Sequence, residues 1–415
     1  MPEKTHHREP PSDAVPIVRT TDRLRSWCRR WKRRGSFAFD TEFVRDETYH
    51  AILGLVQVAD DQDVVLIDPL ARLSLDPFWA LVADPAVRTI VHAGKEDFEL
   101  CLTQSGRPPR NVFDTQIAAG FVGLHYPMSL SRLVQTLLHK RLGKAETLTD
   151  WQRRPLSRSQ IDYAVEDVRY LPQLHRILAE RLQRCGRAGW AEEEFARFED
   201  PALYARPVED RLFRCKGARS LDRAGLAVLR RLLTWRDEWA QRRNRPPRAL
   251  VRDDILVQIA RLRPTQRTQL EILRGFPGGR NPRIASQVLE LVREALAEDP
   301  ATWPTPPPRQ QEDPMTRVVL DVLSALLRSE CHRQGVDQDL VGTTQRLREL
   351  LEYQCQPVGP PPVLLSGWRK ALVGRKLIDL LEGRLGLHLT GWPDSVRLEA
   401  VRRPRRDAGH ERRSP

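Results

Sequence analysis

The chain has 415 residues, of which 40% are hydrophobic, and it carries a formal net charge of +13 with an isoelectric point of about 9.9. This length predicts two to four domains, and no apolar run approaches the roughly 20 residues that a membrane-spanning helix requires, so we expect no membrane partner. The positive excess favours a polyanionic partner, most often nucleic acid, although an arginine-rich surface without a ligand is the alternative.

Cysteine usage and the N-terminal sequence indicate a cytoplasmic protein. The six cysteines form no Cys-x-x-Cys pair and lie near no matching histidine cluster, so zinc sites and disulfide frameworks are both poor interpretations. The opening sequence MPEKTHHREPPSDA lacks the apolar central region of a signal peptide. We therefore expect a disordered tail over residues 1–15 and reduced thiols in the cytoplasm.

The first predicted domain, residues 16–200, begins with a basic helix and three strands. The helix is predicted over Thr20–Arg34, and the sequence from 19 to 34 carries eight basic residues and one acid. Gly35 ends the helix. An apolar strand follows from Phe37, and two more are predicted over Ala51–Ala59 and Asp63–Ile67. Their short connections predict an antiparallel meander.

The rest of this domain alternates helices and strands, which is typical of a mixed α/β sheet flanked by helices. The expected elements are, in order, helix, strand, helix, strand and helix over Leu75–Ala83, Val87–His92, Glu96–Gln104, Asn111–Phe113 and Gln116–Val122. Ser129 is the expected N-cap of a helix over Leu130–His139. Ser157 caps a long helix that runs to about Arg184, with a break at Pro172.

From about residue 207 the pattern is helical. The first helical module, 207–299, has predicted helices over Leu221–Arg242, Asp253–Arg261, Thr265–Ile272 and Asn281–Ala297. A proline-rich linker is expected over 300–314. A second helical module follows over 315–392, and residues 393–415 are expected to form a basic disordered tail.

Two acids at the end of the first strand are candidate metal ligands. Asp40 and Glu42 are two residues apart, so in a strand they point to the same face. Adjacent carboxylates repel each other unless a cation lies between them, and oxygen ligands suit Mg²⁺ or Mn²⁺. The alternative is a strand end whose acids face water.

Further candidates lie on the predicted helices. Asp97 is in the first turn of a helix, where the alternative role is capping. Tyr163 and Asp167 are one turn apart on one face of the long helix. A phenol beside a carboxylate is suited to position a water next to a metal, whereas the alternative is a packed surface turn.

Several neighbouring residues are given structural or solvent-exposed roles. By helical phase, Asp162 and Glu166 point away from the Tyr163 face and are expected to be solvated. Asp114 is expected to cap the helix that follows it. Asp46 and Glu47 are interpreted as loop acids, and Trp151 as a packing residue.

These residues, in this order on an α/β pattern, resemble the DEDDy exonuclease superfamily. The segments DTEFV, LGLVQV, VHAGKEDFEL, VFDTQIAAGF and TLTDWQRRPLSRSQIDYAVEDVRYL closely resemble the bacterial ribonuclease D family. The matching motifs extend from Phe37 to about Leu174. The module over Phe213–Ala297 resembles an HRDC domain, and Met315–Leu389 more loosely resembles a second one.

The resemblance implies a ribonuclease H-like (DnaQ-like) α/β domain with a mixed sheet, followed by two all-α HRDC-type modules. Two Mg²⁺ or Mn²⁺ ions, about 3.5–4 Å apart, would be held by Asp40, Glu42, Asp97 and Asp167, and Tyr163 would orient the attacking water. The implied activity is 3′→5′ exoribonucleolytic release of nucleoside 5′-monophosphates from tRNA precursors and other structured RNAs. Nothing demands more than a monomer.

Four residues are predicted to contact the substrate: Thr41, Phe43, Arg153 and Arg154. Phe43 is a candidate for stacking on a base, and the two arginines are candidates for phosphate contacts. Two alternative functions remain open. One is a DNA exonuclease similar to the Werner-type relatives, and the other is a nucleic-acid binder that has kept the fold and lost turnover.

Overall fold

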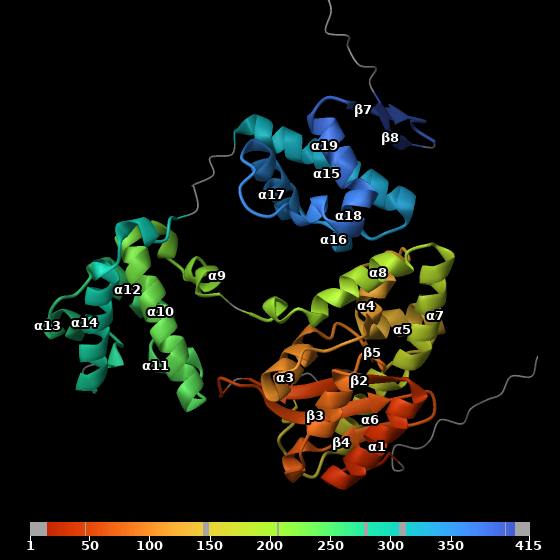
Figure 1. Ribbon diagram of the computed structural model, residues 1–415, viewed down its shortest axis with the longest axis horizontal. Helices are drawn as coiled ribbons and strands as arrows, with labels where there is room; N and C mark the ends of the chain where they lie inside the picture. The colour runs from red at the N-terminus through yellow and green to blue at the C-terminus, as the bar shows by residue number, and fades with distance from the viewer. Residues whose placement is uncertain are drawn as a thin grey trace, which may run out of the picture. The chain divides into compact units, whose positions relative to one another are not determined.

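The computed structural model describes residues 15–45, 47–143, 149–205, 207–277, 281–306, 313–394 and 396–402 (Figure 1). They form two compact units. The first comprises residues 15–40, 56–200 and 313–402, and the second comprises 41–55 and 201–306. Nearly all of the tail predicted over 1–15 lies outside the described residues. None of the described helices is both long and apolar enough to cross a membrane.

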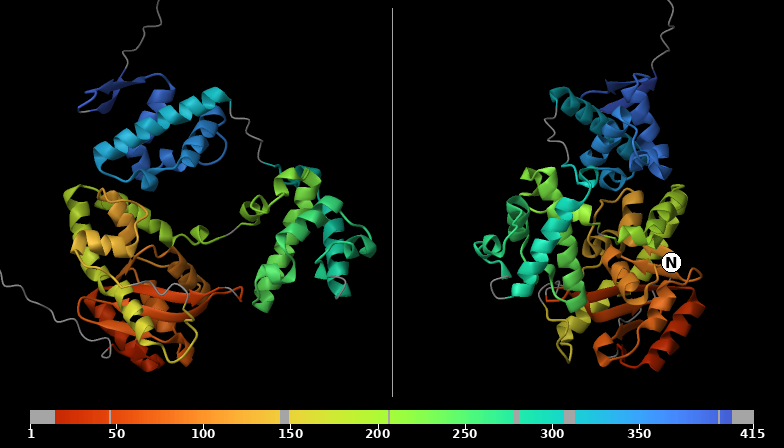
Figure 2. Two further views of the ribbon diagram at one scale, coloured as in Figure 1. Left: turned by 180° about the vertical axis from the view of Figure 1, so that it is seen from behind. Right: turned by 60° about the vertical axis from the view of Figure 1, so that its left-hand side comes forward.

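A six-stranded mixed sheet forms the centre of the first domain, with strand order β1-β4-β3-β2-β5-β6 (Figures 1 and 2). The strands are β1 (Ile17–Val18), β2 (Ser36–Val44), β3 (Ile52–Ala59), β4 (Val64–Ile67), β5 (Arg88–Val91) and β6 (Val112–Asp114). β3 and β4 are antiparallel, whereas β1 pairs with β4, β2 with β5 and β5 with β6 in parallel. The mixed sheet is therefore confirmed. β1 was not predicted, because two residues are too few to show periodicity.

One face of the sheet is covered by α1 (Thr21–Arg34), α2 (Asp76–Val82) and α3 (Lys95–Ser105). The Trp31 ring of α1 stacks on Phe37 at 6.1 Å between centroids. Phe39 contacts Phe78 of α2 at 5.4 Å and Phe98 of α3 at 5.9 Å. Because side chains alternate along a strand, this arrangement directs residues 38, 40 and 42 of β2 to the opposite face.

The opposite face is covered by α6 (Arg158–Arg169), α7 (Leu171–Arg184) and α8 (Ala188–Phe195). Phe113 of β6 contacts His175 of α7 at 4.5 Å and Phe195 of α8 at 4.9 Å. The predicted cap at Ser157 is confirmed as a capping box with Gln160. The predicted break is also confirmed, since Pro172 falls in the first turn of α7 and starts a second helix there.

Acidification is expected to destabilise this domain through His175. Burial, together with the charge of the nearby Arg88, lowers the pKa of His175 to about 4. An unfolded chain therefore takes up this proton near pH 6.5, whereas the folded chain takes it up only near pH 4. Stability is expected to fall as the pH decreases from about 6.5 to 4, by up to about 3 kcal/mol. Thermal unfolding across this pH range would measure the effect.

The matched variants are His175→Gln and His388→Gln, the second on an exposed position of β7. His175→Gln is expected to flatten the dependence of melting temperature on pH between 6.5 and 4.5, whereas His388→Gln should leave it as in the native chain. An unchanged slope in His175→Gln would contradict the assignment.

Two shorter helices complete the domain, α4 (Thr115–Phe121) and α5 (Leu130–Leu138). The Ser129 hydroxyl accepts a hydrogen bond from the Arg132 amide at 3.4 Å, which confirms the predicted cap of α5. The Asp114 carboxylate caps α4 through the amides of Gln116 and Ile117, as predicted.

The second unit contains the predicted first helical module. Its helices are α9 (Val208–Leu212), α10 (Arg223–Arg243), α11 (Pro247–Leu250), α12 (Asp253–Leu262), α13 (Arg267–Glu271) and α14 (Pro282–Ala297). The buried core consists of one face of α10, including Leu229 and Leu232, packed with residues such as Leu256 of α12 and Val288 of α14. An amphipathic central helix with two flanking helices matches the sequence pattern.

The module after the linker is helical but not purely so. It contains α15 (Pro314–Gln334), α16 (Gln338–Val341), α17 (Thr344–Cys355), α18 (Gly367–Arg369), the π-helix η9 (Lys370–Gly374) and α19 (Arg375–Leu381). β7 (Leu385–Thr390) then pairs antiparallel with β8 (Arg397–Arg402).

This hairpin corrects two predictions. The module is not all-α, and the disordered tail predicted over 393–415 is wrong for β8. The arginines of this segment obscured the alternation of Leu398 and Ala400 with polar neighbours. Pairing with β7 makes the strand conformation of this segment favourable. The Ser329 hydroxyl also donates to the Leu398 carbonyl at 2.8 Å and fixes β8 to α15. Residues 403–415 lie outside the described part of the chain.

Within the first unit, this last module contacts the exonuclease helices α4 and α8. The Asp337 amide donates to the Gly120 carbonyl at 2.9 Å. The Arg187 guanidinium donates to the carbonyls of Phe121 at 2.6 Å and Gly335 at 2.8 Å, so it joins both parts. A Cβ on Gly120 would lie 3.0 Å from the Leu340 side chain of α16, so a larger residue at position 120 would crowd this contact.

A buried ion pair lies in the same contact. The Arg369 Nη1 donates to Glu194 Oε2 at 2.6 Å, and both side chains are less than 10% exposed. The Trp368 indole donates to the same oxygen at 3.1 Å. Burial alone would raise the pKa of Glu194, but the hydrogen bond and charge of Arg369 outweigh it and lower this pKa. Arg369 also donates to the carbonyls of Leu340 and Val341, so its charge is fully hydrogen-bonded.

Candidate active site

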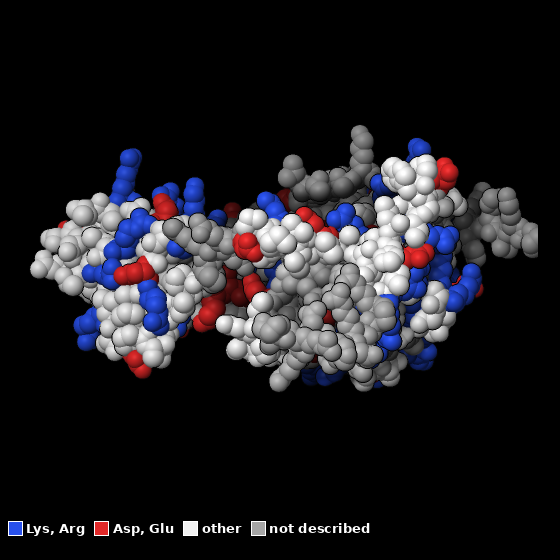
Figure 3. Space-filling model, turned by 90° about the horizontal axis from the view of Figure 1, so that it is seen from above, with Lys and Arg blue, Asp and Glu red and all other residues white. Residues whose placement is uncertain are grey.

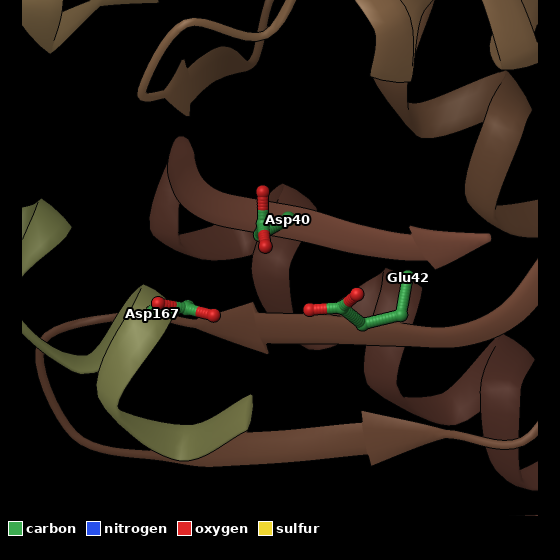
Figure 4. Close-up of side chains that lie close together, drawn as sticks. All are labelled: Asp40, Glu42 and Asp167. Atoms are coloured by element: carbon green, nitrogen blue, oxygen red, sulfur yellow. The ribbon is translucent and has the colours of Figure 1, made fainter. Parts of the chain in front are cut away.

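Three of the predicted acids form a close group at the sheet face that α6 covers. One carboxylate oxygen from each of Asp40, Glu42 and Asp167 lies within 4.8 Å of the others, and all three side chains are half-buried. Figure 4 shows Asp40 and Glu42 extending from β2 toward Asp167 on α6. Three negative charges at this separation repel strongly in a partly desolvated site. The arrangement is therefore stable as a triple anion only with a cation.

Asp167 shows most clearly that this group of acids is suited to a cation. Burial, opposed by a hydrogen bond from Tyr163 and assisted by the charge of Glu166, raises the pKa of Asp167 to about 6. Its Oδ2 atom is buried without a hydrogen-bond partner. Buried carboxylate oxygens are normally paired. An all-oxygen donor set with one unpaired buried oxygen fits a hard divalent cation, so the residues present are suited to hold one.

Tyr163 and Asp97 complete the set of predicted catalytic residues. Tyr163 precedes Asp167 by one turn of α6, and its ring lies 6.0 Å from that of Trp151, which is buried as predicted. Asp97 lies in the first turn of α3 and is 7% exposed. It does not belong to the close group of three formed by described residues. Its role as a metal ligand stays a prediction.

The residues predicted to contact the substrate lie in different surroundings in the structure. Thr41 and Phe43 alternate with the acids along β2, so their side chains point to the other face. Thr41 is buried. The Arg45 guanidinium lies 4.9 Å from the Phe43 ring centroid. Arg153 is exposed. None of the three is placed beside the acids by the structure, and their substrate contacts stay predictions.

Arg154 is committed to an internal ion pair. Its Nε and Nη2 atoms donate to the Asp68 carboxylate at 3.0 and 2.7 Å, and Nη1 donates to the carbonyls of Trp151 and Arg153. Asp68 is 3% exposed, and the hydrogen bond and charge of Arg154 lower its pKa against the opposing effect of burial. A structural role for Arg154 is therefore favoured over phosphate binding.

Of the two helix acids predicted to be solvated, only one is. Asp162 is exposed and pairs with Arg158 on the same helix. Glu166 is half-buried, and its Oε2 accepts a hydrogen bond from the Gly143 amide at 2.6 Å. The prediction for Glu166 was wrong because helical phase carries no information about a loop that arrives from elsewhere in the chain.

Asp114 has a function beyond capping that local sequence could not reveal. Besides α4, its carboxylate accepts hydrogen bonds from the amides of Ala93 at 3.2 Å and Gly94 at 3.1 Å. Ala93 adopts a left-handed backbone with φ of 59°, which is unfavourable for a non-glycine residue. Gly94 immediately precedes α3, and a Cβ there would lie 2.6 Å from Val91. Asp114 thus fixes the turn from which Asp97 projects.

Comparison with known proteins agrees with this geometry. The family model for 3′-5′ exonucleases matches residues 15–183, and the model for HRDC domains matches residues 225–292. Ribonuclease D of Gluconacetobacter diazotrophicus is 34% identical over 377 residues, which cover 90% of this chain and 95% of that protein. Ribonuclease D of Pseudomonas paraeruginosa is 35% identical over 378 residues, covering 88% of this chain and 97% of that protein. The chain belongs to the ribonuclease D family.

A solved member of the ribonuclease D family has the same fold. The crystal structure of Escherichia coli RNase D, described as an exoribonuclease involved in structured RNA processing, is similar with a TM-score of 0.78 and 30% sequence identity. The similarity covers 89% of this chain and 99% of that one. As a ribonuclease D family member with the 3′-5′ exonuclease domain, the protein is a 3′→5′ exoribonuclease.

For this member of the ribonuclease D family, Asp114→Asn is expected to lower turnover by about 10- to 100-fold, the usual effect of losing a residue that holds a metal-site residue in place. An amide nitrogen cannot accept the bond from the Gly94 amide, so the turn before Asp97 should shift. We expect half-maximal activity to require more Mg²⁺, with turnover measured over a range of Mg²⁺ concentrations.

The control is Asp162→Asn, which removes an exposed acid from α6. It should change neither the turnover number nor the Mg²⁺ midpoint. A purely structural role for Asp114 would lower the melting temperature of Asp114→Asn but leave its Mg²⁺ midpoint at the native value, and that result would contradict the positioning role.

Proposed function

We propose that this exoribonuclease trims the 3′ ends of structured RNAs, such as tRNA precursors, in a reaction that depends on two divalent cations and releases nucleoside 5′-monophosphates. The observation that supports this most directly is the group of Asp40, Glu42 and Asp167, with its one buried oxygen that lacks a partner. Mg²⁺ or Mn²⁺ is the cation class that three carboxylates prefer.

The chain's own residues would divide the work as follows. Asp40, Glu42 and Asp167 hold the cations, with Asp97 supplying a further carboxylate. When bound, the cations lower the pKa of a water and neutralise charge that develops on the phosphate. Tyr163, hydrogen-bonded to Asp167, orients the attacking water; its role is to position the water beside the carboxylates.

Structured RNA as the substrate is supported by charge and by the relative described above. A net charge of +13 favours sequence-independent contacts to phosphates. On the face shown in Figure 3, Lys and Arg side chains are interspersed with Asp and Glu. A single-stranded 3′ end would enter the acidic site while the rest of the RNA stays outside.

The test is digestion of a tRNA precursor with a single-stranded 3′ trailer, labelled at its 5′ end. The native protein is incubated with Mg²⁺ or with EDTA, and a single-stranded DNA of matched length is offered in parallel. We expect a ladder that shortens from the 3′ end, is abolished by EDTA, and is far weaker with the DNA. Chromatography of the products should give nucleoside 5′-monophosphates.

Two outcomes would contradict parts of this proposal. Equal shortening of the DNA would favour the alternative of a general 3′→5′ exonuclease and remove the preference for RNA. Digestion that persists in EDTA after exhaustive dialysis would remove the requirement for a divalent cation.

A further inference from the structure

A basic groove lies on the sheet face opposite the acids. It has a volume of about 230 Å³ and is lined by Arg25, Arg29 and Lys32 from α1 and by Pro77, Ala80 and Asp84 from the α2 side. α1 contains seven basic residues and one acid in its sequence TDRLRSWCRRWKRR. The outer surface of this helix is a row of cations beside an apolar floor.

The cations of α1 fall on two sides of the helix. On one side, Arg30 pairs with Asp63, and Arg34 pairs with Asp60 and Asp63. These contacts join α1 to the turn between β3 and β4 and satisfy both arginines. They are structural, so this side of α1 has little capacity to bind an external anion.

The side that faces the groove is less neutralised. Lys32 pairs with Asp84 at 2.7 Å. Arg25 pairs with Asp22 at 2.9 Å, but both side chains are more than half exposed, and such pairs contribute little. Arg29 lines the groove, whereas Arg33 lies one turn further along α1 and outside the lining. Both are exposed and have no acidic partner among the described residues. Their positions differ by about 6 Å along the helix axis.

From this arrangement we infer that the groove between α1 and α2 binds the phosphate backbone of the substrate RNA, on the stem side of the single-stranded 3′ end. The occupant is a polyanion because three cations are available to it. The guanidiniums of Arg29 and Arg33 can replace bound water with a phosphate oxygen, and Arg25 can replace its weak ion pair with one. RNA is the polyanion that this family of enzymes already handles.

Because of its location, the groove would bind the body of the RNA and not its 3′ end. α1 packs on the face of β2 that carries Phe37, whereas Asp40 and Glu42 lie on the other face. A helix is about 10 Å across, so a phosphate in the groove is separated from the acids by more than that distance. A strand that occupies both places must pass around the edge of the sheet, so a structured RNA with its stem outside the active site reaches the groove more readily than a short oligonucleotide does.

This inference rests on the proposed function for the identity of the RNA. Its test distinguishes a failure of the groove assignment from a failure of the proposed function. The variant is Arg29→Ala/Arg33→Ala. The control is Arg23→Ala/Arg181→Ala, which removes two exposed arginines from outside the groove. Binding to a hairpin RNA with a 3′ trailer and to a five-nucleotide RNA is measured in EDTA, so that both RNAs stay intact, over a series of salt concentrations.

We expect the groove variant to bind the hairpin RNA roughly tenfold more weakly, with a salt-dependence slope smaller by about 1.5. Binding of the five-nucleotide RNA should be unchanged. With Mg²⁺, KM for the hairpin should rise by a similar factor while kcat stays within about twofold. The control variant should lose much less affinity for the hairpin RNA. The slope of its salt dependence should stay close to the native value.

Three results would overturn the inference. They are native hairpin affinity in the groove variant, equal losses in the groove and control variants, and an equal loss for the five-nucleotide RNA. If instead the groove variant loses hairpin binding but even the native protein shortens no RNA, the groove assignment stands and the proposed function fails.

Discussion

Replacement of Asp40 by Asn is expected to reduce turnover by at least about 10³-fold, because the variant loses one of three clustered carboxylates and with it several kcal/mol of metal-dependent charge stabilisation. The same substitution is expected to raise the melting temperature in EDTA. In the metal-free protein the three carboxylate oxygens lie within 4.8 Å, and removing one charge relieves their repulsion. Activity and metal-free stability should therefore change in opposite directions.

The measurement pairs single-turnover digestion of the 5′-labelled RNA with thermal unfolding in EDTA and in Mg²⁺. The native protein should gain stability from Mg²⁺ by mass action, and Asp40→Asn should gain much less. Asp76→Asn, at an exposed position that starts α2, is the control and should retain activity. Near-native turnover in Asp40→Asn, or a clear loss of its stability in EDTA, would contradict the account of the site.

Removal of the Arg369 side chain is expected to cost about 3–5 kcal/mol in the free energy of unfolding, which is the usual penalty for breaking a buried ion pair. In Arg369→Ala, Glu194 keeps its charge and its ion pair with Arg197, but it loses its buried partner at 2.6 Å. The carbonyls of Leu340 and Val341 also lose their donors. Urea unfolding, followed by the fluorescence of the buried Trp368 and its neighbours, would measure the loss.

Two further proteins make this test specific. Arg184→Ala breaks the exposed pair between Arg184 and Glu180 and should cost less than about 1 kcal/mol. The double variant Glu194→Leu/Arg369→Met replaces the buried pair with apolar side chains and should recover part of the lost stability. The carbonyls of Leu340 and Val341 and the Trp368 indole still lack their partners in this variant. If Arg369→Ala and Arg184→Ala are equally stable, the buried pair does not fix the last module to the exonuclease domain.

The features that sequence predicted well are those set by local periodicity. Strand alternation placed Asp40 and Glu42 on one face, and helical spacing placed Tyr163 beside Asp167. The structure brings Asp40, Glu42 and Asp167 together as expected. Helix limits at Gly35, Ser157 and Pro172 followed from the restricted backbone or capping chemistry of those residues.

The features that sequence missed depend on contacts between distant segments. The bond from the Gly143 amide to Glu166 and the bonds from Ala93 and Gly94 to Asp114 join residues about 20 positions apart. No periodicity in either segment predicts them. The grouping of residues 313–402 with the exonuclease domain was missed for the same reason, since it depends on side chains such as Arg369 that read locally as surface arginines.

The division of the acids between β2 and α6 also has a consequence during synthesis of the protein. Asp40 and Glu42 leave the ribosome early, but Asp167 and Tyr163 follow only after the rest of the sheet has been translated. With the ligands assigned as proposed, a nascent chain that lacks α6 has an incomplete ligand set, and we expect it to have no hydrolytic activity. We therefore expect that the messenger and the ribosomal RNA beside the chain are not attacked until α6 has emerged and folded onto the sheet.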